Sequence, residues 1–270
     1  MLPLINIPSL KGQKALIADD SQLSQFLLGE LLKNCGLVPE FAGNGQDALR
    51  MASAESYVII FLDVYMPVMD GLQCAQLIRG LTNTNANVPI IAVTANQFES
   101  DKHLFSTAGV TSTIVKPITQ EQIEQLLTSL FSDDSMSKLE PSLDSDNLSQ
   151  EHSIINLAYL KKTGKDDPVF LVKMLNSFCQ TAEKILHSLK EAVQQKDDRT
   201  LQDLLHQLKF PLGVVGQSDL VSQITVLEKQ IKQEGPASAR ESCYTKIEGL
   251  APVVQHLITE ARKIISTTIL

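Results

Sequence analysis

Residues 57–71 read YVIIFLDVYMPVMDG, and they give the clearest indication of the fold of the first half of the chain. Its first six residues are apolar or aromatic, as in a strand whose two faces are both buried in a parallel sheet, and the run ends at Asp63. Similar short runs occur on both sides of it. They are KALIA at 14–18, PIIAVTA at 89–95, TSTIV at 111–115 and a weaker candidate, LVPEFA, at 37–42.

Helical patterns separate these runs, and the two kinds of segment alternate five times. The expected helices span 23–35, 46–54, 72–81, 100–108 and 121–130. Strands that alternate with helices in this way favour parallel pairing with helices on both faces of the sheet. We therefore predict that residues 1–131 form a doubly wound, flavodoxin-like α/β domain with a five-stranded parallel sheet.

The remainder of the chain has a different character. Residues 132–153, SDDSMSKLEPSLDSDNLSQEHS, are rich in Ser and Asp and have little periodicity, so we predict a flexible acidic linker. From residue 154 onward the apolar positions keep helical spacing, and the acidic residues before Pro168 are typical of a helix start. Residues 154–270 are expected to form an all-α helical bundle of four or five helices, with a break in the last helix near Pro252.

Composition limits the classes of function. The chain has 270 residues, enough for two domains, with 43% hydrophobic and 20% charged residues. Its formal net charge of -8 argues against nucleic acid as a partner. No apolar run is long enough to cross a membrane, and the first residues make a poor signal peptide. The four cysteines form no CxxC pair, which favours reduced thiols and a cytoplasmic location.

Polar side chains follow the predicted strands of the first domain. Asp19 and Asp20 follow the first strand, Asp63 the third, Thr94 lies near the end of the fourth, and Lys116 follows the fifth. Open α/β sheets bind ligands at the carboxyl ends of their strands. Clustered carboxylates favour a hard divalent cation such as Mg²⁺, and a lysine with a hydroxyl can hold a phosphoryl group. The pattern indicates Mg²⁺-assisted phosphoryl transfer to a carboxylate.

Five motifs carry a resemblance to a known family. In order and spacing, ALIADDS, AGNGQDAL, FLDVYMPVMDG, AVTAN and IVKPI resemble the receiver domain of two-component response regulators over residues 12–131. The resemblance implies that Asp63 is the phosphoacceptor and that Asp20 coordinates Mg²⁺ with Asp19 beside it. Asp63 and the backbone carbonyl of Tyr65 would complete the protein ligands of the metal.

The same resemblance assigns the remaining residues of the site. Thr94 and Lys116 would bind the phosphoryl oxygens, and the Lys116–Pro117 peptide bond would be cis. One position departs from the family pattern: an aromatic residue usually lies three residues before the lysine, and here that residue is Thr113. This difference leaves the expected phosphorylation unaffected. It argues against the family's usual way of signalling phosphorylation through the fifth strand.

One histidine of the second domain lies on the polar side of its predicted helix. At 100° per residue, His206 falls roughly 140° from the centre of a leucine face, near Gln202, Lys209 and Gly213. An exposed imidazole beside a lysine can accept a phosphoryl group. The leucine face comprises Leu201, Leu204, Leu205, Leu208 and Leu212.

The segment around this histidine resembles the motif of histidine phosphotransfer (HPt) domains. LLHQLKFPLGVVG, residues 204–216, has the spacing His, Leu two later, Lys three later and Gly ten later, and the likeness covers about residues 154–267. It implies that His206 is the phosphohistidine and Lys209 a supporting cation. Phe210 and Pro211 stand where the family has Gly and a small residue. We expect Phe210 to hinder a docking receiver and Pro211 to kink the helix.

Together the two resemblances match the C-terminal portion of hybrid sensor kinases. They imply a phosphorelay protein that passes phosphoryl groups between Asp63 and His206 and partners with a sensor histidine kinase, another response-regulator receiver, or both. No kinase ATP-binding region is present, so ATP is not expected as the direct substrate. An alternative is a phosphorylation-controlled receiver fused to a degenerate, catalytically silent docking module.

Overall fold

The computed structural model describes residues 10–94, 102–131, 155–164, 166–232 and 237–268. The chain divides into two compact units, Met1–Asn147 and Leu148–Leu270. The predicted linker at 132–153 lies outside the described residues and stays a prediction. No described helix is both long enough and apolar enough to span a membrane.

The first unit contains the expected parallel sheet. Its strands are β1 (Lys14–Ala18), β2 (Val38–Ala42), β3 (Ile59–Asp63), β4 (Ile90–Thr94) and β5 (Ser112–Val115), and their order in the sheet is β2-β1-β3-β4-β5. Every residue of β3 and β4 is buried, as their apolar sequences predict, whereas the edge strands β2 and β5 are partly exposed. The doubly wound fold is confirmed.

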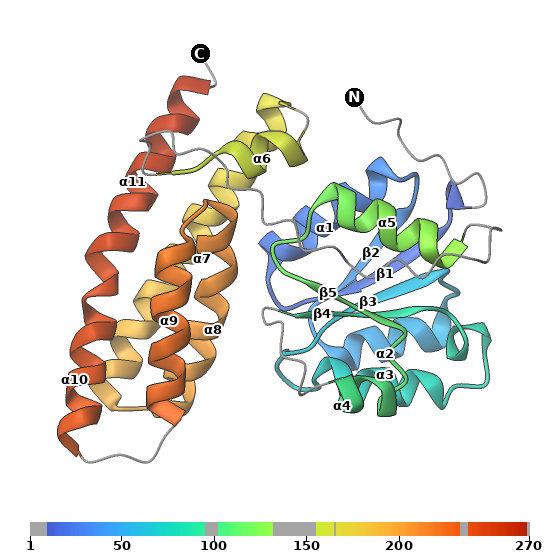
Figure 1. Ribbon diagram of the computed structural model, residues 1–270, viewed down its shortest axis with the longest axis horizontal. Coiled ribbons are helices and arrows are strands. Elements are labelled where there is room, and N and C mark those ends of the chain that lie inside the picture. The colour runs from blue at the N-terminus through green and yellow to red at the C-terminus, as the bar shows by residue number, and fades with distance from the viewer. Residues whose placement is uncertain (1–9, 95–101, 132–154, 165, 233–236, 269–270) are drawn as a thin grey trace. The chain divides into compact units, whose positions relative to one another are not determined.

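Helices cover both faces of this sheet (Figure 1). One face carries α1 (Gln22–Asn34) and α5 (Gln120–Phe131), and the other carries α2 (Gly45–Ala54), α3 (Gly71–Arg79) and α4 (Lys102–Thr107). Three helices begin at side-chain caps, because Ser21, Asn44 and Asp70 each accept a hydrogen bond from a backbone N–H three residues later. The start of the helix predicted at 100–108 lies partly outside the described residues.

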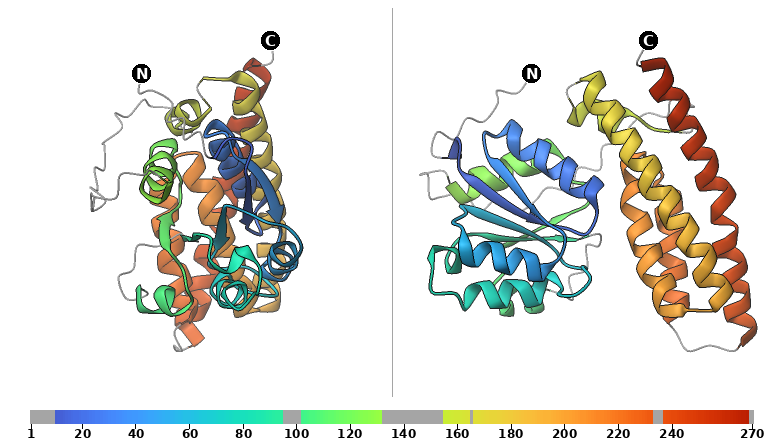
Figure 2. Two further views of the ribbon diagram at one scale, coloured as in Figure 1. Left: turned by 90° about the vertical axis from the view of Figure 1, so that its right-hand side faces the viewer. Right: turned by 180° about the vertical axis from the view of Figure 1, so that it is seen from behind.

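The second unit is a bundle of helices (Figure 2). Its helices are α6 (Ala158–Thr163), α7 (Pro168–Gln195), α8 (Asp198–Val214), α9 (Ser218–Lys232), α10 (Ala237–Glu248) and α11 (Leu250–Thr268). Helix α8 packs between α7 and α9, and α11 packs on α7. The bundle core includes Phe178, Leu205, Leu208, Ile224 and Ile258, each fully buried. The predicted all-α bundle is confirmed, although the described residues form six helices where four or five were expected.

Two prolines of the bundle behave differently. Pro211 lies inside α8, which runs unbroken from Asp198 to Val214, so the proline does not end the helix. Pro252 lies in the first turn of α11, where a missing N–H leaves no helical bond unmade. The break expected near Pro252 falls instead at Gly249, between α10 and α11.

Candidate functional site

Three carboxylates meet at the carboxyl ends of β1 and β3, which are neighbours in the sheet. Asp19 and Asp20 follow β1, and Asp63 ends β3. One carboxylate oxygen from each lies within 4.8 Å of the others. Asp19 and Asp63 are buried and Asp20 is half-buried. The strand order reverses between β1 and β3, which is the position where sheets of this kind form a binding crevice.

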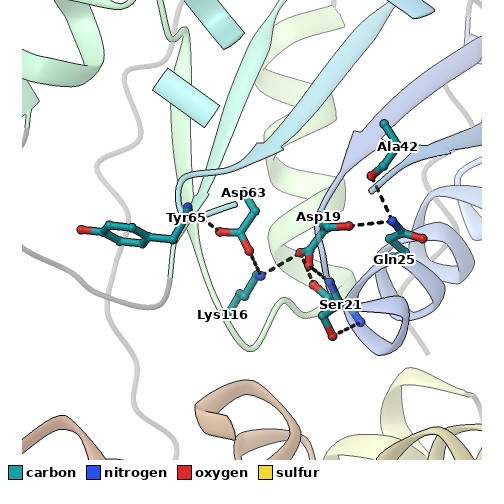
Figure 3. A network of polar contacts seen from close by, with 8 residues as sticks. Asp19, Ser21, Gln25, Ala42, Asp63, Tyr65 and Lys116 are labelled. Atoms are coloured by element: carbon teal, nitrogen blue, oxygen red, sulfur yellow. Dashed lines mark hydrogen bonds and ion pairs between the residues drawn. The ribbon is translucent and has the colours of Figure 1, made fainter. Parts of the chain in front are cut away.

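Lys116 joins two of these carboxylates (Figure 3). Its Nζ lies 2.7 Å from Asp19 Oδ2 and 2.7 Å from Asp63 Oδ2, and its side chain is only 8% exposed. The lysine follows β5 directly, and the Lys116–Pro117 peptide bond is cis, as expected. Sequence positions 19, 63 and 116 are therefore brought into one network of charge-assisted hydrogen bonds.

Burial and charge shift the titration of these groups. Burial raises the pKa of Asp63, while the charge of Lys116 opposes that rise. Burial, followed by the charges of Asp19 and Asp63, raises the pKa of Asp20 to about 6. Burial disfavours the Lys116 ammonium, but the two carboxylates outweigh it and raise the pKa of Lys116. Burial thus disfavours the charged form of Asp20 and of Asp63, and Lys116 offsets part of that cost at Asp63.

The donor set fits a small divalent cation. All three acidic side chains offer oxygen ligands, which Mg²⁺ prefers. Mg²⁺ binds oxygen at about 2.0–2.1 Å, so its ligand oxygens lie up to about 4.2 Å apart. The carboxylate oxygens of the cluster, which lie within 4.8 Å of one another, are close to that range.

Two further predicted residues lie at the same edge of the sheet. The Tyr65 backbone N–H donates to Asp63 Oδ1 over 3.3 Å, while the Tyr65 side chain is exposed (Figure 3). Thr94 ends β4 and is buried, and its carbonyl accepts the Lys116 backbone N–H over 2.8 Å.

A Cβ at Gly71 would lie 2.1 Å from the Asp63 carbonyl oxygen, so only glycine lets α3 begin this close to the acidic residue.

A second polar cluster lies between α8 and α9. His206 Nδ1 lies 3.2 Å from Glu228 Oε1, and Lys209 Nζ lies 2.7 Å from Glu228 Oε2. The side chain of His206 is 28% exposed, that of Glu228 17% and that of Lys209 6%. Burial raises the pKa of Glu228, but the hydrogen bonds from His206 and Lys209 outweigh it and lower that pKa overall.

This cluster corrects the wheel-based expectation in two places. His206 is half-buried, where full exposure was expected, and Lys209 is buried against Glu228. The physical reason is that α8 packs on both α7 and α9, so its buried arc is wider than the leucine stripe. Phe210 is half-buried, where the wheel placed it on the exposed side. Glu228 itself was missed, because its sequence position gives no sign of the helix that it faces.

Gly216, the last residue of the HPt-like motif, ends α8. Its φ of 79° is left-handed, and the Gln217 N–H donates to the Leu212 carbonyl over 2.9 Å, which is a glycine helix stop. A Cβ at Gly216 would lie 2.4 Å from Asn156 Cβ. The glycine of the motif therefore serves the packing of the bundle.

Two protein-family models match the chain. Residues 15–128 match the response regulator receiver domain, and residues 173–264 match the Hpt domain. The two matches do not overlap and correspond to the two compact units.

Two curated relatives of the chain are histidine kinases. The signal transduction histidine-protein kinase BarA of Escherichia coli (strain K12) is 24% identical over 263 residues, covering 96% of this chain and 27% of the relative. The sensor histidine kinase RcsC of the same strain is 37% identical over 113 residues, covering 42% of this chain and 12% of the relative. The chain thus spans about a quarter of the length of the relative that it matches from end to end.

One solved structure with similarity to the first unit is the receiver domain of a sensor histidine kinase from Pseudomonas aeruginosa PAO1, which has a magnesium ion coordinated in its active site cleft. It is 29% identical, covers 44% of this chain and 98% of its own, and has a TM-score of 0.42.

Proposed function

Because the chain carries a response regulator receiver domain at residues 15–128 followed by an Hpt domain at residues 173–264, we propose that it relays phosphoryl groups in two-component signalling. The observation that carries the proposal is that each domain presents a phosphoryl acceptor already held by charged partners. In the receiver this is Asp63 beside Lys116, and in the Hpt domain it is His206 beside Glu228.

In the receiver, Asp63 is the nucleophile. A carboxylate oxygen of Asp63 forms a bond to phosphorus while the bond between phosphorus and the donor atom breaks. The donor, a histidine nitrogen or the oxygen of a small acyl phosphate, leaves with the electron pair. Lys116 already touches Asp63 and is placed to meet the negative phosphoryl oxygens, and Thr94 ends the neighbouring strand beside it.

Asp20, Asp63 and the Tyr65 carbonyl would hold Mg²⁺ in this site, with Asp19 next to them. The bound ion supplies positive charge against the phosphoryl oxygens. Burial keeps Asp63 and Lys116 away from bulk water, so the attraction of Lys116 for a phosphoryl group is screened less than at the surface.

In the Hpt domain, Glu228 positions the imidazole. Its contact with Nδ1 favours the tautomer that carries the proton on Nδ1, so Nε2 is the nitrogen that accepts phosphorus. Lys209 in turn holds the other carboxylate oxygen of Glu228. We therefore propose that Lys209 supports His206 through Glu228, and not by direct contact with the phosphoryl group.

The partners of such a relay are a sensor histidine kinase, another receiver domain, or both. The four cysteines are free thiols, which supports a cytoplasmic location. The domain limits we propose are 1–131 for the receiver and 154–270 for the Hpt-like bundle, with 132–153 as the linker.

The first test is phosphorylation of the full chain by acetyl phosphate with Mg²⁺. Intact-mass measurement is expected to show one added phosphoryl group, which disappears in Asp63→Asn or when EDTA is added. Asp47→Asn is the matched control, since Asp47 is an acidic residue of α2 outside the acidic cluster, and it should label normally. An adduct that persists in Asp63→Asn, and does not map to a neighbouring carboxylate, would contradict the assignment.

The second test concerns His206. A phosphorylated receiver is mixed with the chain carrying Asp63→Asn, and a base-stable, acid-labile label is expected on His206 and absent from His206→Gln. Replacing Phe210 by Gly and Pro211 by Ser should speed the transfer if those side chains obstruct docking. A helical unit that takes no label from any receiver, with or without these replacements, would instead be a silent docking module.

A further inference from the structure

The first turns of α1 reach back to the acidic site. The Ser24 hydroxyl, which is buried, donates to Asp19 Oδ2. Gln25 Nε2 donates to the backbone carbonyls of Asp19 over 2.6 Å and of Ala42 over 3.0 Å (Figure 3). Helix α1 thus holds Asp19 twice, through its carboxylate and through its main chain.

Both carboxylate oxygens of Asp19 are engaged. Oδ1 accepts the Ser21 N–H over 2.9 Å, and Oδ2 accepts both Ser24 and the Lys116 ammonium, the latter over 2.7 Å. With one donor on Oδ1 and a second fixed donor on Oδ2, the carboxylate plane cannot turn about its last bond without losing a hydrogen bond. The oxygen that Lys116 contacts is therefore held in place by Ser24.

The contact differs from those of two other helical hydroxyls in the same unit. Ser53 of α2 and Thr128 of α5 each donate to a carbonyl four residues earlier in their own helix, over 2.8 and 2.7 Å. Ser24 donates to a side chain outside its helix instead. The helix end does not need that hydroxyl either, because the N-cap of α1 is Ser21, whose Oγ accepts the Ser24 N–H.

Resting on the proposed function, we propose that Ser24 is a positioning residue of the receiver site. Its hydroxyl fixes the Asp19 carboxylate, and this carboxylate places the Lys116 ammonium where it is shared equally between Asp19 and Asp63. Lys116 is then already at the acidic cluster when phosphoryl oxygens arrive, so its reorganisation during transfer is small.

The first experiment reads the ammonium directly and needs no activity. The side-chain NH₃⁺ resonance of Lys116 is followed by NMR in the full chain without metal, with Lys116→Arg used to assign it. Ser24→Ala and Ser24→Cys, the second of which keeps the volume but weakens the donor, should both shift this resonance and speed its hydrogen exchange. Ser24→Thr, which keeps the hydroxyl, and the control Ser53→Ala should leave it in place.

The second experiment measures the rate of labelling by acetyl phosphate at saturating Mg²⁺. Ser24→Ala and Ser24→Cys should each slow it by about tenfold, as expected for a charged group displaced by a fraction of an ångström, and Ser24→Thr should recover most of the rate. Since Ser24 is not a metal ligand, Mg²⁺ affinity in the same variants, titrated with the metal alone, should change by less than about threefold.

Two results would overturn the inference. An unchanged Lys116 resonance in Ser24→Ala would show that the hydroxyl does not hold the ammonium. An effect in Ser24→Ala that is absent in Ser24→Cys would assign it to lost packing. If wild-type protein takes no phosphoryl group at all, the proposed function fails, and the resonance still decides the role of Ser24.

Discussion

Glu228 of α9 connects two polar side chains of the neighbouring helix α8. It accepts hydrogen bonds from His206 and Lys209 across the α8–α9 contact, and Lys209 is almost fully buried there. A buried ammonium without its partner is costly, so the lysine and the glutamate depend on each other. One residue of α9 thereby fixes the orientation of the candidate phosphohistidine and neutralises the cation beneath it.

We predict that Glu228→Gln lowers the free energy of unfolding of the helical unit by about 2 kcal/mol at pH 7, because it leaves Lys209 buried without a countercharge. The hydrogen bonds lower the pKa of Glu228 on folding. A lowered pKa stabilises the fold above the unfolded value of about 4.3, and this contribution disappears as the pH falls through the folded value.

The measurement is urea unfolding of wild type and Glu228→Gln between pH 3 and pH 7. The difference between the two proteins should be largest near pH 7 and shrink below about pH 4. Glu191→Gln is the control, because Glu191 is exposed on α7 and pairs only weakly with exposed His187. A difference that stays constant over the whole pH range would contradict the ion pair as its source.

At the scale of elements, α8 shows how a bundle accommodates a proline. Pro211 has no N–H to donate to the Gln207 carbonyl, yet α8 continues to Val214 and the proline is buried. Leu208 and Leu212 on either side of it are fully buried, and α7 and α9 pack along the helix. Tertiary packing of the apolar face therefore outweighs the local cost of about 3 kcal/mol.

We predict that Pro211→Ala raises the stability of α8 by about 1–2 kcal/mol, since the regained helical hydrogen bond exceeds the loss of buried ring methylenes. Hydrogen exchange of α8 amides in the full chain provides the measurement. Pro252→Ala is a matched control, because its proline lies in the first turn of α11 and its replacement should change stability by less than about 0.5 kcal/mol. Faster exchange in Pro211→Ala would mean that the packing of the proline ring stabilises α8 more than the regained hydrogen bond does.

At the scale of the whole molecule, each unit has a core of its own. The sheet of the first unit buries β3 and β4 completely, and the bundle buries its apolar face around residues such as Phe178 and Leu205. A unit with its own core and more than 100 residues can fold by itself. Both candidate sites, moreover, are assembled from residues of a single unit.

We predict that fragments 1–131 and 154–270 each unfold cooperatively, and that their calorimetric transitions lie within about 3 °C of those in the full chain. Limited proteolysis of the full chain should cut first within 132–153, because this Ser- and Asp-rich sequence has little apolar surface to bury. First cuts elsewhere, or a fragment without a cooperative transition, would contradict the proposed boundaries.

The sheet, the bundle and most of the receiver site could be predicted from the amino-acid pattern alone. Apolar runs of strand length that end in Asp63 or Thr94 set the strands, and the carboxyl ends of parallel strands meet at one edge whatever the details of packing. The placement of Asp19, Asp20 and Lys116 at that edge follows from the same rule, and so does the polar cluster that these residues form with Asp63.

The contacts that these residues make with other elements could not be predicted in this way, because they depend on tertiary packing. The partnership of Lys209 with Glu228 depends on how α9 packs against α8, and the contact of Ser24 with Asp19 depends on how α1 returns to the end of β1. A helical wheel treats one helix alone, so it left Lys209 on a polar side that a neighbouring helix covers. Periodicity reports which face of an element is apolar, whereas the pairing of buried polar groups depends on which elements meet, and that is settled only when the core packs.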